Sequence, residues 1–374
     1  MTTLAKWVGV IGWAATVGLH EPARANVTPA AKAGRSGNAA QQATVPQVLA
    51  RYGGGEFEAA IDDLVRDGEL GEAVERFREG SKPWLSDAAA NDRPRRLGIV
   101  AIVALELVAR GVDGTIDEYE SARPLVEWAC TLLRREQPSE IERLYHLASV
   151  ALAQGARDES LLAGGPPRGT RHILHGAERY PGEGRLKLAW LTVHPETRFI
   201  SSWPLPPGYL LSPATRDPDP RGAMKELQRT LDALGLLVND PSVGAEAKLR
   251  RAALRVAMGQ PGVVSADLQD AGRSADPFVR YLAHLLRGVA LESTDRRAEA
   301  VAAYEAAVRT VPGTAASIAL ASALFRENRR SEAAGVVETW AGADRTEDPW
   351  RLYSLRDYRL FPGYLRTMRA LVVQ

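Results

Sequence analysis

The chain has 374 residues, with 47 basic and 46 acidic side chains, so its net charge is close to zero. This balance argues against nucleic acid or an anionic membrane as an electrostatic partner. A length above roughly 250–300 residues also argues against a single compact core, which leaves two domains or an extended repeat. The one cysteine, Cys130, cannot form an intramolecular disulfide, and we expect it to be a small buried residue.

Residues 1–25 have the pattern of an export signal. Lys6 precedes the apolar run Trp7–Leu19, and Ala23–Ala25 has the A-x-A form of a cleavage site. The run is 13 residues long, which is too short to span a bilayer. We therefore expect an exported protein that is not inserted in a membrane after cleavage near Asn26. Arginine greatly outnumbers lysine, which favours a bacterial source and a periplasmic or extracellular location.

Residues 26–44 are small and polar without an apolar period, which predicts a disordered leader. A helical pattern begins at Val45, and glycines at 53–55 interrupt it. Beyond these glycines one helix face is apolar, with Phe57, Ile61, Leu64 and Val65. This arrangement is typical of the turn and second helix of a degenerate repeat.

Three longer helices are predicted next, at about Arg95–Arg110, Arg123–Glu136 and Ser139–Gln154. The first is apolar nearly all round, which in a soluble protein indicates a buried central helix. A Gly- and Pro-rich loop follows, and then a helix pair at His172–Tyr180 and Arg185–Val193. We expect residues 45–194 to form either degenerate repeats or a separate helical bundle.

Residues 195–220 are less regular and carry seven prolines. Insertions in repeat proteins lie in loops on one face of the array, so this segment is interpreted as a Pro-rich insertion.

A spacing of small and large residues repeats in residues 221–344. Its clearest example is G-x2-L, then A-x3-Y, then a proline, at Gly288, Leu291, Ala300, Tyr304 and Pro312. The spacing recurs 33 residues later at Ala321, Leu324, Ala333 and Val337. It recurs 35 residues earlier at Ala253, Val256 and Pro277. The small residues let two antiparallel helices approach closely, and the large apolar residues fill the space beside the contact.

This pattern resembles the tetratricopeptide repeat (TPR) family. The resemblance implies an all-α, right-handed superhelical solenoid of antiparallel helix pairs, with degenerate repeats toward the N-terminus. It also implies a non-catalytic module that binds a protein or peptide partner on its concave face. The family's contact positions correspond here to Arg250, Leu254, Leu285, Glu292, Ile318, Ser322 and Arg326.

Arg250 and Arg326 are the residues expected to pair with carboxylates of that partner. The subgroup of the family that holds chaperone C-termini uses Lys and Asn at such positions. This chain has Leu, Arg and Ser instead, so that particular activity is not implied.

Residues 345–374 are rich in aromatic side chains, at Trp350, Tyr353, Tyr358, Phe361 and Tyr364. A terminal cap that closes the last repeat requires such bulk, so we expect capping helices here.

Nucleotide-binding, nucleophile-elbow and zinc-protease motifs are absent from the sequence, so we predict no catalytic residue, no metal and no cofactor. Two alternative hypotheses stay open. One is a cell-wall or metal-dependent hydrolase whose site is assembled across repeats, with His172 and His175 as metal ligands near Glu178 and His194. The other is a structural subunit of an envelope assembly, which would be a constitutive oligomer.

Overall fold

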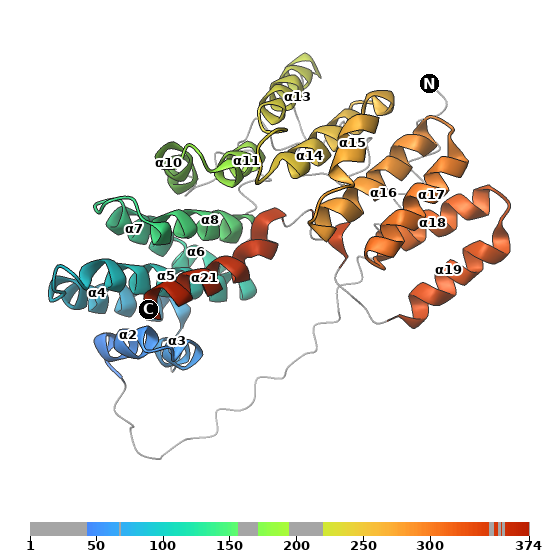
Figure 1. Cartoon of the computed structure of the whole chain (residues 1–374). Helices are drawn as coiled ribbons and strands as arrows, with labels where there is room; N and C mark the ends of the chain where they lie inside the picture. Colours follow the sequence, from blue (N-terminus) through green and yellow to red (C-terminus); the bar gives the residue numbers. More distant parts are fainter. Residues whose placement is uncertain are drawn as a thin grey trace. The chain divides into compact units, whose positions relative to one another are not determined.

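The computed structural model describes residues 43–66, 69–155, 171–193, 220–343, 348–350, 353 and 356–373. Every regular element within these residues is a helix, which confirms the predicted all-α class (Figure 1). None of the described helices is long and apolar enough to cross a membrane. The predicted export signal, the leader up to residue 42 and residues 195–219 of the Pro-rich insertion lie outside the described residues.

The described chain forms two compact units. The N-terminal unit combines residues 36–195 with residues 355–374, and the repeat unit lies within residues 196–354. The two ends of the described chain therefore belong to the same unit.

The N-terminal unit is built around α5 (Arg93–Asp113), in which every residue from Leu97 to Val108 is buried. The prediction of a buried central helix is confirmed. Other elements of this unit pack on α5 or on one another. They are α2 (Val45–Gly53), α3 (Phe57–Val65), α4 (Leu70–Ser86), α6 (Ile116–Ala122), α7 (Pro124–Leu133), α8 (Glu140–Gly155), α10 (Arg171–Arg179), α11 (Gly184–Val193), the 3-10 turn η4 (Arg356–Leu360) and α21 (Phe361–Val373). Cys130 on α7 is buried, as expected, and burial raises the pKa of its thiol to about 11.

Helix α21 packs on α5 and α8 (Figure 1), and its buried residues are Phe361, Met368 and Val372. Residues 345–374 do not form the single cap on the last repeat that their aromatic content predicted, because they divide between the two units. Trp350 and Tyr353 belong to the repeat unit, and residues 356–373 belong to the N-terminal unit. The physical reason is that α5 is apolar all round and requires cover on every side, which the apolar face of α21 supplies.

A buried ionic network fixes α21 in place. Nε and Nη2 of Arg369 lie 2.9 and 2.8 Å from Oε1 of Glu106 on α5. The hydroxyl of Tyr52 on α2 donates to the same oxygen at 2.6 Å, and Nη1 of Arg369 lies 2.9 Å from Glu58 on α3. Burial raises the pKa of Glu106 even though Tyr52 and Arg369 both favour its charged form. The network joins four helices through one buried carboxylate.

The repeat unit consists of consecutive helices. They are α13 (Pro220–Gly235), α14 (Gly244–Ala257), the 3-10 turn η3 (Pro261–Val263), α15 (Ser265–Ala271), α16 (Pro277–Ser293), α17 (Arg297–Thr310), α18 (Thr314–Arg326) and α19 (Arg330–Gly342). Helices α16 and α17 pack together, α18 packs on α17, and α19 packs on α18. The helix pairs predicted from the repeated spacing are present in this unit.

The same turn ends the first helix of four helix pairs. Positive φ occurs in the described residues at Gly55 (97°), Gly259 (76°), Asp295 (60°) and Asn328 (62°). After each of them, the next N–H donates to the carbonyl five residues earlier, at 3.2, 2.9, 2.9 and 3.0 Å respectively. This left-handed ending of a helix favours Gly and Asn. Asp295 and Asn328 are 33 residues apart, which is the period of the sequence pattern, and Gly55 lies where the turn of a degenerate repeat was predicted.

The close approach of α16 and α17 depends on Gly288. A Cβ atom at this position would lie 2.2 Å from Cε1 of Tyr304, whose side chain is 1% exposed. The close approach of two helices at a small residue, predicted from the sequence, is present here, and Tyr304 is the side chain that Gly288 contacts. In the next pair, Ala321 takes the place of Gly288 and is slightly larger, and Val337 takes the place of Tyr304 and is smaller.

We expect Gly288→Ala to destabilise the repeat unit by about 1–3 kcal/mol, because the methyl group overlaps a ring that has no free space to enter. Gly335→Ala on α19 is the matched control, since a Cβ atom there meets nothing within 4 Å. It should stabilise the protein by about 0.5–1 kcal/mol through helix propensity. Urea denaturation followed by circular dichroism measures both, and equal effects would contradict the contact.

Candidate binding surface on the repeat helices

The structure locates the seven predicted contact residues in three environments. Buried residues are Arg250, Leu254 and Leu285; half-buried residues are Glu292, Ile318 and Ser322; Arg326 is exposed. Most of them are therefore engaged with the unit itself, and two of them contact each other.

Arg250 on α14 is 1% exposed, which corrects the expectation that it is available to a partner's carboxylate. Its Nε and Nη2 donate to Oε1 of Glu246 at 3.0 and 2.6 Å, and its guanidinium lies 4.9 Å from the ring centroid of Tyr353. The i, i+4 spacing places Glu246 beside Arg250 on one helix. The family's contact positions could not reveal this, because they do not include Glu246 or the distant Tyr353.

Glu292 and Arg326 form an ion pair between consecutive helix pairs. Nη2 of Arg326 lies 2.6 Å from Oε1 of Glu292, and the hydroxyl of Tyr304 donates to Oε2 at 2.7 Å. Burial raises the pKa of Glu292, although Tyr304 and Arg326 both favour its ionised form. Arg326 is thus already matched with a carboxylate of this chain.

Asp348 lies beyond α19 and contacts two of the preceding helices. Its Oδ1 accepts a hydrogen bond from the hydroxyl of Tyr281 on α16 at 3.0 Å. Its Oδ2 accepts the N–H of Ala315 in the first turn of α18 at 2.6 Å, and the N–H of Ala316 donates to the Tyr281 oxygen at 3.1 Å. A carboxylate at a helix N-terminus satisfies amides that the helix leaves unpaired.

Two aromatic rings follow Asp348. Trp350 stacks on Tyr353, with ring centroids 6.2 Å apart and an angle of 11° between the planes. Tyr353 is 2% exposed and covers Arg250. The residues Asp348, Trp350 and Tyr353, which we call the 348–353 segment, thus contact α14, α16 and α18.

The surface on which the 348–353 segment lies, made by Arg250, Tyr281 and the first turn of α18, was not predicted from the sequence apart from Arg250 itself. A signal was present, since Asp348 precedes Pro349 and accepts the N–H of Trp350 at 2.8 Å, which is an Asx turn. Such a turn identifies a fixed bend in the chain, but it does not identify the helices against which the bend packs.

The alternative of a metal site rests on the histidines of α10, in the N-terminal unit. Nδ1 of His175 lies 3.7 Å from Oε2 of Glu178. The side chain of His172 and residue His194 lie outside the described residues. Among the side chains that are described, no group of three His, Cys, Asp or Glu residues could hold a metal ion.

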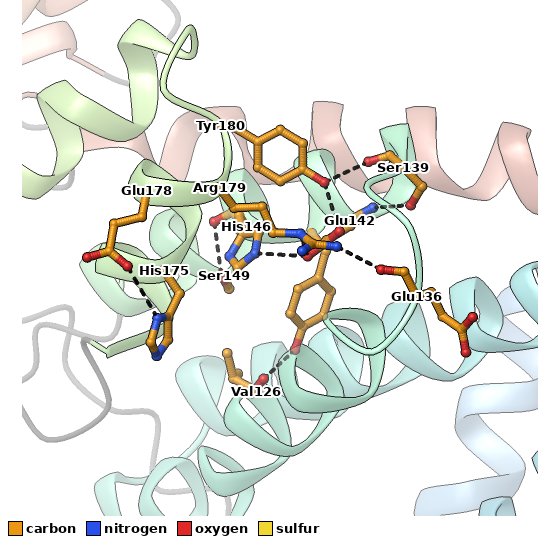
Figure 2. Close-up of polar contacts among 11 residues, drawn as sticks. Val126, Glu136, Ser139, Glu142, His146, Ser149, His175, Glu178, Arg179 and Tyr180 are labelled. Carbon is orange, nitrogen blue, oxygen red and sulfur yellow. Dashed lines mark hydrogen bonds and ion pairs between the residues drawn. The ribbon is translucent and has the colours of Figure 1, made fainter.

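A buried carboxylate joins α8 and α10 in the same unit (Figure 2). Oε1 of Glu142 lies 2.6 Å from Nε of Arg179 and 3.8 Å from Nε2 of His146, and its Oε2 lies 2.9 Å from the hydroxyl of Tyr180. Burial opposes the charge of Glu142, but His146, Tyr180 and Arg179 together lower its pKa. Burial and the nearby Glu142 raise the pKa of Tyr180 to about 12. The cluster links two helices through a carboxylate that stays ionised.

We expect Glu142 to make the stability of the N-terminal unit depend on pH. Its pKa is lower in the folded than in the unfolded chain, so its contribution is present above the unfolded pKa of about 4.3. It is lost as pH falls through the folded pKa. Glu142→Gln should be less stable than the wild type at neutral pH, and the difference should shrink below pH of about 4.

The measurement for Glu142 is urea denaturation at a series of pH values between neutral and acidic. Glu75→Gln on α4 is the control, because the Glu75 side chain is 65% exposed and belongs to the same unit. A difference between wild type and Glu142→Gln that stays constant with pH would contradict the expectation.

No protein-family model matches the sequence, and neither a curated protein nor a solved structure matches it. The resemblance to tetratricopeptide repeats therefore stays a prediction made from the sequence.

Proposed function

We propose that this chain is a non-catalytic protein-binding or scaffold module of the bacterial envelope. In this proposal, it binds an extended segment of a partner protein across α14, α16 and α18. The observation that supports it is the 348–353 segment, which already occupies this surface with a carboxylate and two aromatic rings. The envelope location rests on the export pattern of residues 1–25.

The chemistry of the surface suggests the kind of partner segment. An acidic side chain would accept hydrogen bonds from the hydroxyl of Tyr281 and the amide of Ala315, while the amide of Ala316 donates to the Tyr281 oxygen. An aromatic ring five residues later would stack on the guanidinium of Arg250. A partner with this spacing would compete with the 348–353 segment for the same positions.

The experiment uses a fluorescent peptide with the sequence of residues 345–356 and measures its anisotropy with the full chain. We expect weak binding to the wild type and at least roughly tenfold tighter binding to Asp348→Asn, since loss of the Asp348 contacts loosens the chain's own segment. A peptide with alanine in place of its Asp, Trp and Tyr is the control, and it should not bind.

Failure of the peptide to bind either protein would count against the proposed surface. A second variant separates a loss of binding from misfolding. Tyr281→Phe in the Asp348→Asn background should fold but bind the peptide more weakly than Asp348→Asn alone. The reason is that the surface then lacks the hydroxyl that donates to the carboxylate.

A further inference from the structure

The last helix pair of the repeat unit exposes an unusual amount of apolar surface. Phe325 on α18 and Val337 and Trp340 on α19 are 57%, 48% and 38% exposed. They are three of the six large hydrophobic side chains that are exposed among the described residues. In α19 itself, only Ala333 is buried.

The corresponding face of the preceding helix pair is largely buried. Ala334, Val337 and Ala341 of α19 correspond, 33 residues earlier, to Val301, Tyr304 and Val308 of α17. Val301 and Tyr304 are 2% and 1% exposed, and Val308 is half-buried. Helix α18 packs on α17 (Figure 1). Tyr304 is covered by α16 of its own pair. The equivalent residues of α19 are all exposed to solvent, so the α19 face is open where the corresponding α17 face is largely buried.

The charged residues of this α19 face are complementary to those of the same face in a second copy of the chain. Arg330, Ala334, Val337, Glu338 and Ala341 lie at i, i+4, i+7, i+8 and i+11, on one side of the helix. If two α19 helices cross in antiparallel fashion at Ala334, Arg330 of each copy lies opposite Glu338 of the other. Alanine at the crossing point allows the two backbones to approach closely.

We propose that the α19 face, defined as Arg330, Ala334, Val337, Glu338 and Ala341, binds the same face of a second copy of this chain. The contact is isologous, because a two-fold axis at Ala334 buries both apolar stripes and forms both ion pairs. It is independent of the binding surface that carries the 348–353 segment.

Sedimentation equilibrium of the full chain tests the proposal. We expect a monomer–dimer equilibrium for the wild type, and Ala334→Arg should give a monomer with an unchanged far-ultraviolet circular dichroism spectrum. The matched control is Ala302→Arg on α17, also an exposed alanine, and it should leave the dimer intact. A wild-type chain that stays monomeric at about 100 µM, or a dimer that tolerates Ala334→Arg, overturns the proposal.

A charge exchange tests the antiparallel arrangement. Arg330→Glu and Glu338→Arg should each raise the dimer Kd by roughly tenfold or more, since each places like charges opposite one another twice. The double variant Arg330→Glu with Glu338→Arg restores opposite charges and should return the Kd to near the wild-type value. A double variant as weak as either single variant overturns the proposed pairing.

Discussion

Replacement of Arg369 by Met is expected to destabilise the N-terminal unit by about 3–5 kcal/mol, because it leaves a buried carboxylate without its counter-charge. Arg369 contacts Glu106 with two nitrogens, and the Glu106 side chain is 8% exposed. Tyr52 would remain as the only donor to that oxygen within this network, and a neutral hydroxyl cannot balance the charge.

Hydrogen exchange detected by mass spectrometry measures the effect of Arg369→Met separately for each unit. Amides of α5 should exchange faster in the variant, and those of α16 and α17 should not change. The double variant Arg369→Met with Glu106→Gln should recover part of the lost stability, since it removes the unpaired charge as well. An equal or larger loss in the double variant would contradict this account.

Tyr353→Ala is expected to destabilise the repeat unit by about 3–5 kcal/mol, as large-to-small replacements of buried aromatic residues generally do. The ring is 2% exposed, stacks on Trp350 and lies over the guanidinium of Arg250. Its removal would leave a cavity beside a buried charge, which adds to the cost.

Thermal unfolding and hydrogen exchange of α14 test the prediction for Tyr353. The control is Leu236→Ala in the same unit, where the side chain is 86% exposed and the change should be within about 0.5 kcal/mol. If Tyr353→Ala is as mild as Leu236→Ala, the 348–353 segment is not a structural part of the unit.

Local patterns predicted the helices and the repeat well. The burial of α5 followed from its continuous apolar composition, and the close helix approach at Gly288 followed from a small residue at a repeated position. Both depend on residues close together in the sequence or on the period of one helix. The left-handed turn at Asn328 could likewise be expected from the residue type and from its position 33 residues after Asp295.

Contacts between distant residues could not be predicted in this way. Arg369 is 263 positions from Glu106, and nothing in either local pattern connects them. The aromatic residues after position 345 were therefore assigned together, although they divide between two units. Arg250 was misassigned for the same reason, because its burial depends on Tyr353, about 100 residues later in the chain.

The position of α21 also has a consequence for protein synthesis. The N-terminal unit includes residues from both ends of the described chain, so the ribosome must translate the whole repeat unit before α21 exists. Until then α5 lacks one of its packing partners, and its apolar surface is exposed to aggregation or to chaperones. Premature termination before residue 361 yields an N-terminal unit that lacks α21. Helix α21 thus makes folding of this unit conditional on synthesis of the repeat unit.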